Sequence, residues 1–285
     1  MRISAIQMLA STSLEANLKQ AEDLIAQAVS EGANLIVLPE YFAYYGCGSG
    51  DCSRAETASE RGVLEVSEDG PVRSFLREQA RKQGVWLVGG TLPVADKPAE
   101  SRPYAASFVL DDRGCEVARY NKIHLFDVDV AEGGDQDSRY RESQDYCPGD
   151  TPVVVETPFG KLGLSVCYDL RFPELYRYLS ACGAEILLVP SAFTAATGKA
   201  HWQLLLRARA VENLCYVVGA NMGDRNHPGK PTWGGSTIID PWGGVIAEIA
   251  GGQGVVSADI DLQKLKQLRQ KMPALEHRRL SVVKS

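Results

Sequence analysis

Hydrophobic and polar positions follow two different periods along the chain. Residues 2–8 and 161–166 place apolar side chains at every second position, which is the period of a β-strand. Residues 35–38, Leu-Ile-Val-Leu, are apolar without interruption, as expected of a strand covered on both faces. Residues 12–31 repeat their apolar side chains every three to four positions, which predicts a helix.

The same patterns divide the rest of the chain into strands and helices. Further strands are predicted at 85–91, 104–110, 115–121, 152–156, 185–190, 215–221, 235–239, 244–249 and 254–260. Further helices are predicted at 71–83, 172–182, 199–213 and 261–271. Polar, glycine-containing stretches predict connections at 41–70, 95–103 and 127–150. Because no repeat or linker divides the series, we predict one α/β domain over residues 1–285, with mixed sheets covered by helices.

Composition narrows the classes of function. The chain is 45% hydrophobic and 23% charged, as is usual for a globular protein. A formal net charge of −6 without a basic run argues against a nucleic-acid partner, and no apolar run approaches the ~18 residues of a membrane span. The seven cysteines include no Cys-x-x-Cys pair, and the first residues enter a strand without the apolar region of a signal peptide. We therefore expect a cytoplasmic protein without disulfides or a thiolate zinc site.

Cys167 lies where the predicted strand 161–166 ends. Pro173 and Glu174 suit the first turn of the helix that follows, so the thiol is placed on a strand-to-helix turn. Such a turn aims backbone N–H groups at a ligand, and a helix N-terminus lowers the pKa of a thiol. Cys167 is therefore a candidate nucleophile, and a small, inert, buried cysteine is the alternative.

Two charged residues also follow predicted strands. Glu40 ends the strand at 35–38, and Lys122 ends the strand at 115–121. Ligands of open α/β sheets bind outside the carboxyl ends of strands, where a carboxylate, an ammonium and a thiol form a set suited to acyl transfer. Taken singly, Glu40 is more often a strand-end cap and Lys122 a solvated charge, and the coincidence of the three residues is what favours a site.

Three segments around these residues resemble the motifs of the nitrilase, or carbon–nitrogen hydrolase, superfamily. They are LIVLPE at 35–40, YNKIHLFD at 120–127 and VCYDLRFPE at 166–174, and they occur in the order of the family's motifs. The resemblance implies a four-layer αββα sandwich with mixed sheets that forms a homodimer or a higher homo-oligomer. It also implies a catalytic triad of Glu40 as base, Lys122 as oxyanion stabiliser and Cys167 as nucleophile, without a cofactor.

The resemblance assigns further residues. Some members of the superfamily carry a second glutamate after the lysine motif, for which Glu142 is the candidate and Glu132 the rival. Segments 190–194 and 197–202 resemble the group that contains deaminated-glutathione amidases and ω-amidases. From this resemblance we expect contacts with the substrate, or with its oxyanion through a backbone N–H, from Tyr168, Phe193, Lys199 and Trp202.

Two of these substrate contacts have alternatives. Core packing is the more common role for residues such as Phe193 and Trp202. A substrate carboxylate needs a cation, because an unpaired buried charge is costly. Lys199 is preferred for that role over Arg171, which is expected to shape the turn after the cysteine. No histidine stands with a carboxylate cluster at the spacing of a metal site.

The leading hypothesis is an enzyme that acts on carbon–nitrogen bonds other than peptide bonds. It would hydrolyse a small carboxylate-bearing amide through a cysteine thioester, with deaminated glutathione as the first substrate. The ω-amidase substrate α-ketoglutaramate, or that of another amidase of the superfamily, is the alternative. A Cys-His hydrolase with His201 or His124 as base, and a catalytically silent binding protein of the same fold, are competing hypotheses.

Overall fold

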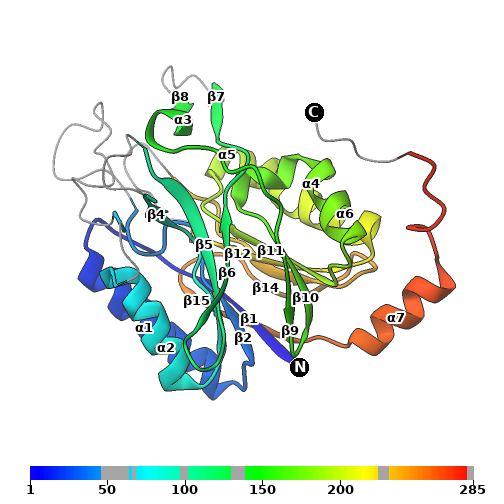
Figure 1. Ribbon diagram of the computed structural model, residues 1–285, viewed down its shortest axis with the longest axis horizontal. Coiled ribbons are helices and arrows are strands. Elements are labelled where there is room, and N and C mark those ends of the chain that lie inside the picture. The colour runs from blue at the N-terminus through cyan, green and yellow to red at the C-terminus, as the bar shows by residue number, and fades with distance from the viewer. Residues whose placement is uncertain (46–63, 66–68, 97–101, 130–138, 224–230, 281–285) are drawn as a thin grey trace.

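Two β-sheets pack face to face and carry helices on their outer faces (Figure 1). This computed structural model describes residues 1–45, 64–65, 69–96, 102–129, 139–223 and 231–280. The arrangement of layers is helix, sheet, sheet, helix, which confirms the predicted αββα sandwich.

The first sheet has the strand order β15-β1-β2-β3-β5-β4, with β6 paired to β5. Its strands are β1 Arg2–Gln7, β2 Leu35–Val37, β3 Trp86–Val88, β4 Leu92–Val94, β5 Tyr104–Leu110, β6 Glu116–Asn121 and β15 Gly254–Asp259. Strands β1, β2 and β3 are parallel, and the remaining pairs are antiparallel. The sheet is therefore mixed, as predicted.

The second sheet has the order β14-β13-β12-β11-β10-β9. Its strands are β9 Val154–Thr157, β10 Gly160–Leu164, β11 Ile186–Ser191, β12 Tyr216–Asn221, β13 Ser236–Ile239 and β14 Val245–Ile249. It too has a parallel centre, formed by β10, β11 and β12. A small separate ribbon pairs β7 Asp127–Asp129 with β8 Arg139–Arg141.

Strand alternation divides the core between the layers. In β2, Leu35 and Val37 belong to the cluster shared with the second sheet, whereas Ile36 belongs to the cluster under the helices. That outer cluster is covered by α1 Leu14–Ser30 and α2 Pro71–Gln83. Both faces of the strand are apolar for this reason, as the uninterrupted hydrophobic run predicted.

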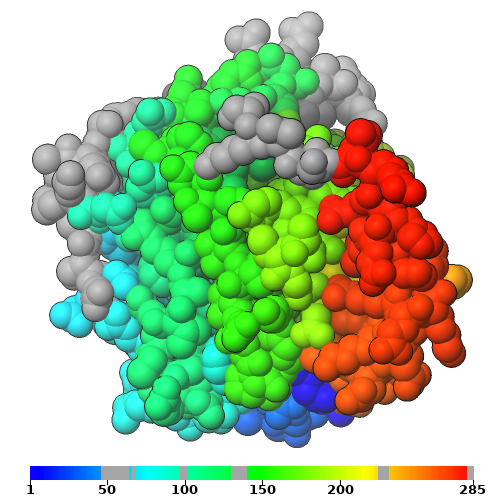
Figure 2. Space-filling view, turned by 45° about the vertical axis from the view of Figure 1, so that its right-hand side comes forward, coloured from blue at the N-terminus to red at the C-terminus, as the bar shows by residue number. Residues whose placement is uncertain are grey.

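The opposite face of the sandwich carries the helices α4 Pro173–Ala181 and α6 Gln203–Asn213. The other helical segments are α3 Glu142–Asp145, η1 Cys167–Arg171, α5 Ala195–Thr197, η2 Gly198–Trp202 and α7 Leu262–Lys271. Figure 2 shows α7 and the residues after it, in orange and red, along one side of the molecule. Arg269 on α7 donates hydrogen bonds to the carbonyl oxygens of Leu214 and Ala184, which fixes this helix to the second sheet's side.

The sequence-based boundaries need three corrections. The stretch predicted as strand 85–91 ends at Val88, because Gly90 turns the backbone with a φ of 46°, and the chain then pairs again as the edge strand β4. The stretch 127–150, predicted as a loop, contains β7, β8 and α3. The helix predicted at 199–213 begins with the π-helical turn η2 before α6.

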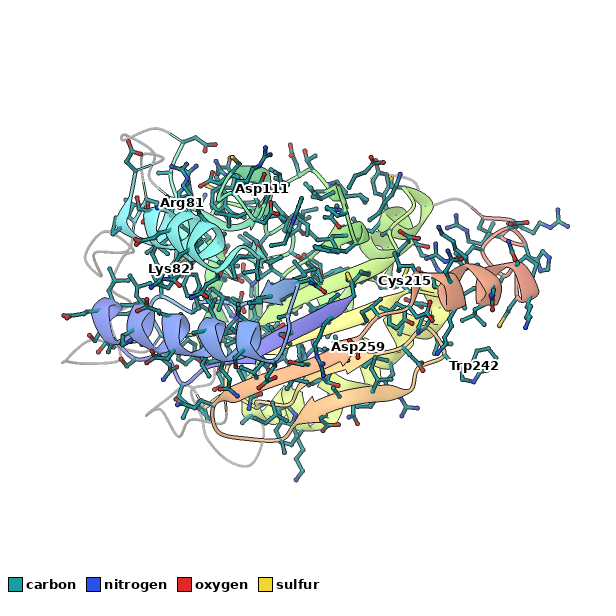
Figure 3. All side chains as sticks on the ribbon, turned by 90° about the horizontal axis from the view of Figure 1, so that it is seen from below. Arg81, Lys82, Asp111, Cys215, Trp242 and Asp259 are labelled. Carbon is teal, nitrogen blue, oxygen red and sulfur yellow. The ribbon has the colours of Figure 1, made fainter. Side chains whose placement is uncertain are left out.

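Two further observations complete the description of the fold. Trp242, in the turn between β13 and β14, is 67% exposed and projects outward (Figure 3). Within the described ranges, the structure contains no helix that is both long and apolar enough to cross a membrane.

Candidate active site

Three strand ends bring the predicted triad together. β6 is antiparallel to β5, which is antiparallel to β3, so β6 runs in the same direction as β2 and β3. Glu40 shortly follows β2 and Lys122 directly follows β6, whereas Cys167 follows β10 of the other sheet. The three side chains therefore meet where the two sheets face each other.

Lys122 stands between two carboxylates. Its Nζ donates to Glu40 Oε1 at 2.8 Å and to Glu142 Oε1 and Oε2 at 2.9 and 2.8 Å. The Lys122 side chain is only 2% exposed. Burial works against the ammonium, but the charges of Glu142 and Glu40 outweigh it and hold the pKa of Lys122 well above its usual value. Lys122 is thus a fixed positive charge in a site screened from water.

Glu40 faces both the thiol and the lysine. It lies beside the Cys167 thiol, and its Oε2 accepts a hydrogen bond from the Ala192 N–H at 2.8 Å. Burial raises the pKa of Glu40, the nearby Lys122 ammonium opposes the rise, and the charge of Glu142 adds to it. A carboxylate with a raised pKa is a stronger base, so Glu40 is equipped to take the thiol proton.

Glu142 accepts hydrogen bonds from three groups, which belong to two stretches of the chain. Besides Lys122, its Oε1 accepts from the Tyr41 hydroxyl at 3.0 Å and its Oε2 from the Phe126 N–H at 2.6 Å. Helix α3, which begins at Glu142, presents this carboxylate to the lysine. Glu132, the rival second glutamate, lies outside the described residues.

Cys167 opens the 3₁₀-helix η1 with a φ of 48°, a left-handed conformation that costs a non-glycine residue about 1–3 kcal/mol. The strand-to-helix turn is therefore present as predicted, and Pro173 starts α4. The expectation of a lowered pKa is wrong for the resting thiol: burial raises the pKa of Cys167, and the charge of Glu40 raises it further. The thiol consequently needs a base to react.

The predicted substrate contacts fall into two environments. Phe193 and Trp202 are buried with their ring centroids 5.0 Å apart, and Trp202 Nε1 donates to the Gly235 carbonyl at 2.7 Å. Tyr168 is partly exposed beside the cysteine, whereas Lys199 is exposed on η2.

Arg171 lies between two of these rings. Its guanidinium is 5.8 Å from the centroid of Tyr168 and 5.5 Å from that of Phe193. The turn after the cysteine thus places this cation next to the predicted site, in contact with aromatic faces that stabilise positive charge.

The two histidines of the Cys-His hypothesis are engaged elsewhere. His124 Nδ1 lies 2.7 Å from Asp169 Oδ1, and His201 Nδ1 lies 3.3 Å from Arg171 Nη1. The Cys167 thiol instead lies beside Glu40, so the arrangement favours a carboxylate base. Among the described residues no group of three His, Cys, Asp or Glu side chains is placed to hold a metal ion.

Sequence analysis missed the groups that orient the acidic residues. Tyr41 adopts a φ of 57° and its backbone N–H donates to Thr91 Oγ1 at 3.1 Å, which turns its hydroxyl toward Glu142. The Ala192 N–H, at the end of β11, holds Glu40. A position next to a candidate base was the available signal for Tyr41, whereas nothing in the sequence marks a backbone N–H.

Comparison with known proteins identifies the family of this chain. The sequence profile described as "Carbon-nitrogen hydrolase" matches residues 2–270. A protein of Synechocystis sp. named "Deaminated glutathione amidase" is 42% identical over 277 residues, which cover 96% of this chain and 97% of the relative. "Omega-amidase NIT2" of Xenopus tropicalis is 37% identical over 281 residues, covering 98% and 95% of the two chains.

A solved structure shares the fold. The crystal structure of the NitFhit protein of Caenorhabditis elegans superposes with a TM-score of 0.86 at 36% identity. The match covers 98% of this chain and 65% of that chain, so the chain spans just under two thirds of the solved protein.

Proposed function

We propose that this chain, which belongs to the carbon–nitrogen hydrolase family, hydrolyses a small carboxylate-bearing amide through a thioester on Cys167. The observation that carries the proposal is that one buried carboxylate adjoins both a thiol and an ammonium: Glu40 accepts from Lys122 and lies near enough to Cys167 for each to shift the pKa of the other. Base, nucleophile and electrostatic stabiliser are thus within reach of one another.

The reaction follows from these contacts. Glu40 takes the proton of Cys167, and the sulfur attacks the amide carbon, which becomes tetrahedral. The Lys122 ammonium, together with the backbone N–H of Tyr168, stabilises the oxyanion. Collapse of this intermediate breaks the carbon–nitrogen bond, and the protonated Glu40 gives its proton to the leaving nitrogen as ammonia or an amine departs.

The second half of the reaction reuses the same base. Glu40 takes a proton from water, the hydroxide oxygen attacks the thioester carbon, and the acid is released as Cys167 regains a proton. Glu142 serves the cycle by holding Lys122 through both of its oxygens. A preorganised charge of this kind needs no rearrangement when the oxyanion forms.

Deaminated glutathione is our first substrate, because a relative 42% identical over nearly the whole chain bears that name. α-Ketoglutaramate, an ω-amide, is the alternative supported by the ω-amidase relative. Both substrates carry carboxylates. Lys199 remains our predicted partner for that charge, and Arg171 is the rival that the ring contacts support. Location in the cytoplasm, assembly as a homodimer and a single domain over 1–285 complete the proposal.

The test compares kcat/KM for deaminated glutathione, α-ketoglutaramate and their methyl esters in wild type, Lys199→Met and Arg171→Met. A charged hydrogen bond is worth about 1.5–3 kcal/mol, so the acids should exceed their esters by roughly 10- to 150-fold. The variant that lacks the true carboxylate partner should lose this preference and the other should keep it. Equal rates on acid and ester in wild type contradict the carboxylate requirement, and faster turnover of α-ketoglutaramate assigns ω-amidase activity.

The base is tested separately with Glu40→Gln. Glutamine retains the shape of the side chain but cannot take the thiol proton, and removal of a general base lowers rates by roughly 10²- to 10⁴-fold. Near-normal kcat in this variant would favour a histidine base. Absence of turnover on every amide by wild type, with Cys167 unreactive toward them, would support a silent binding protein instead.

A further inference from the structure

Asp169 is a fully buried carboxylate that the proposed reaction does not use. Its Oδ2 accepts from the Tyr120 hydroxyl at 2.7 Å and from the Val166 N–H at 2.8 Å. Its Oδ1 accepts from the His124 N–H at 3.0 Å and lies 2.7 Å from His124 Nδ1. Because an ionised carboxylate only accepts, the Nδ1 of His124 carries the proton in this contact.

The partners of Asp169 come from the two segments that carry the reacting charges. Tyr120 and His124 flank Lys122 on either side, and Val166 directly precedes Cys167. One carboxylate therefore joins the end of β6 in the first sheet to the turn after β10 in the second. The lysine and the cysteine meet only across the sheet interface, so a link at this point sets their separation.

The His124 ring is fixed on its other side as well. It stacks on Phe172 with the ring centroids 3.6 Å apart and the planes 6° from parallel. Phe172 belongs to the same turn as Cys167 and Asp169. The ring thus links the lysine segment to the cysteine turn twice, through a hydrogen bond and through a stacked aromatic pair.

We propose that Asp169 is a positioning residue, which holds the Lys122 ammonium and the Cys167 sulfur in register for attack on the amide carbon. The inference rests on the proposed function and deepens it. Misplacement of reacting groups by about 1 Å costs a rate on the order of 10²-fold. Asp169 acts through Tyr120, His124 and Val166, and its loss should appear in the acylation step rather than in substrate binding.

The first variant is Asp169→Asn, which keeps the size of the side chain but turns an NH₂ group toward donors that need an acceptor. We expect kcat to fall on the order of 10²-fold while KM for deaminated glutathione changes less than about threefold. The kcat of each variant is calculated from the concentration of folded enzyme, as determined by circular dichroism. A loss of kcat explained by unfolded protein, or a loss of kcat/KM that comes from a raised KM alone, would overturn the proposal.

A matched pair at His124 decides the question even where Asp169→Asn does not fold. His124→Asn offers a side-chain N–H near the position of Nδ1, whereas His124→Ala removes both that donor and the stacked ring. The His124 side chain is 27% exposed, so either variant is expected to fold. The positioning role requires a lower kcat in His124→Ala and a substantial recovery in His124→Asn, and equal activities of the two variants contradict it.

Cys167→Ala separates this proposal from the function on which it rests. If Cys167→Ala still turns over the amide, the thioester reaction itself is wrong. If Cys167→Ala is inactive and both Asp169→Asn and His124→Ala behave like wild type, the reaction stands and the positioning role of Asp169 falls.

Discussion

A buried thiol is a poor nucleophile until a base removes its proton. At Cys167, burial therefore has two opposing effects. Burial gives the site its strong electrostatics but raises the pKa of Cys167, so the resting group is a thiol at neutral pH. In the proposed reaction Glu40 removes this proton, because its own pKa is raised, mainly by burial, and it lies beside the thiol. Activation therefore depends on the pair and not on the cysteine alone.

The first prediction at this scale is an acyl adduct on Cys167. A substrate whose thioester is hydrolysed slowly should add its acyl mass to the peptide that contains Cys167, as measured by intact-mass and peptide mass spectrometry. Cys215 is the internal control, because it is buried beside Arg269 with a pKa raised to about 11 by burial. Cys182 is an exposed control. An adduct on either control in place of Cys167 would refute the assignment.

The second prediction concerns pH. Glu40 must be ionised to act, and its pKa lies above the ordinary 4.5, so kcat/KM should fall on the acid side at a pH above that value. The charge of Glu142 contributes to this rise. Glu142→Gln removes the charge, so the residual activity should have its acid limb at lower pH, besides a reduced kcat.

Two controls accompany the pH profile. Tyr41→Phe removes the hydroxyl that contacts Glu142 but leaves the charge, so the acid limb should remain in place. Glu132→Gln should match wild type in both rate and profile. A dead Glu132→Gln beside a normal Glu142→Gln would mean that the second catalytic glutamate is Glu132.

At the scale of elements, the sequence predicted the bounds of helices and strands best where local residues determine where an element starts and ends. Helix α2 has the predicted bounds because Pro71 starts it and Gly84 ends it with a φ of 63°. Strand 127–129 and helix α3 were missed because their polar residues form no hydrophobic period, although Asp127 accepts from the Ser143 N–H there. A hydrophobic period indicates elements that have a buried face, but it does not indicate elements that are held by polar contacts.

The turn at Gly90 offers a third prediction. A Cβ on Gly90 would meet the Pro39 carbonyl oxygen at 2.0 Å, and its φ of 46° already disfavours a side chain. Gly90→Ala should therefore push Pro39 and displace the adjacent Glu40, lowering both the free energy of unfolding and the kcat of folded enzyme. The loss of stability should exceed the roughly 1–3 kcal/mol of backbone strain alone.

Gly84→Ala is the matched control for this turn. Gly84 also has a positive φ, of 63°, but a Cβ there meets nothing within 4 Å. It should lower stability in urea unfolding without changing kcat. Equal kcat in the two alanine variants would show that the Pro39 contact does not position Glu40.

At the scale of the whole molecule, the site could be predicted only in part. Spacing placed Glu40, Lys122 and Cys167 at strand ends, and the resemblance to a family supplied their association. No local pattern in the sequence indicates that β6 lies in one sheet and β10 in the other. The contacts of Asp169 with Tyr120 and His124 depend on that topology, and they could be recognised only once the sheets were in place.

We expect the interface of the predicted homodimer to lie on the second sheet's side, where helix α6 supports the turn of Cys167. Large apolar side chains are exposed on the second sheet's side: Tyr178 on α4 is 47% exposed and Val211 on α6 is 45% exposed. Trp242, labelled in Figure 3, is 67% exposed. A Cβ on Gly243, next to Trp242, would touch Val211, so these two positions adjoin. Exposed apolar clusters of this kind mark protein interfaces.

Helix α6 also supports the cysteine turn, since Arg209 donates to the Leu170 carbonyl at 3.1 and 2.7 Å. If a second copy covers α4 and α6, Val211→Glu should shift the protein to monomer in size-exclusion chromatography with light scattering, and kcat should fall as the turn loosens. Val117→Glu is the matched control: Val117 is 43% exposed but lies on β6 of the other sheet, so this variant should remain a dimer. A dimer retained in Val211→Glu, or dissociation of Val117→Glu instead, would place the interface elsewhere.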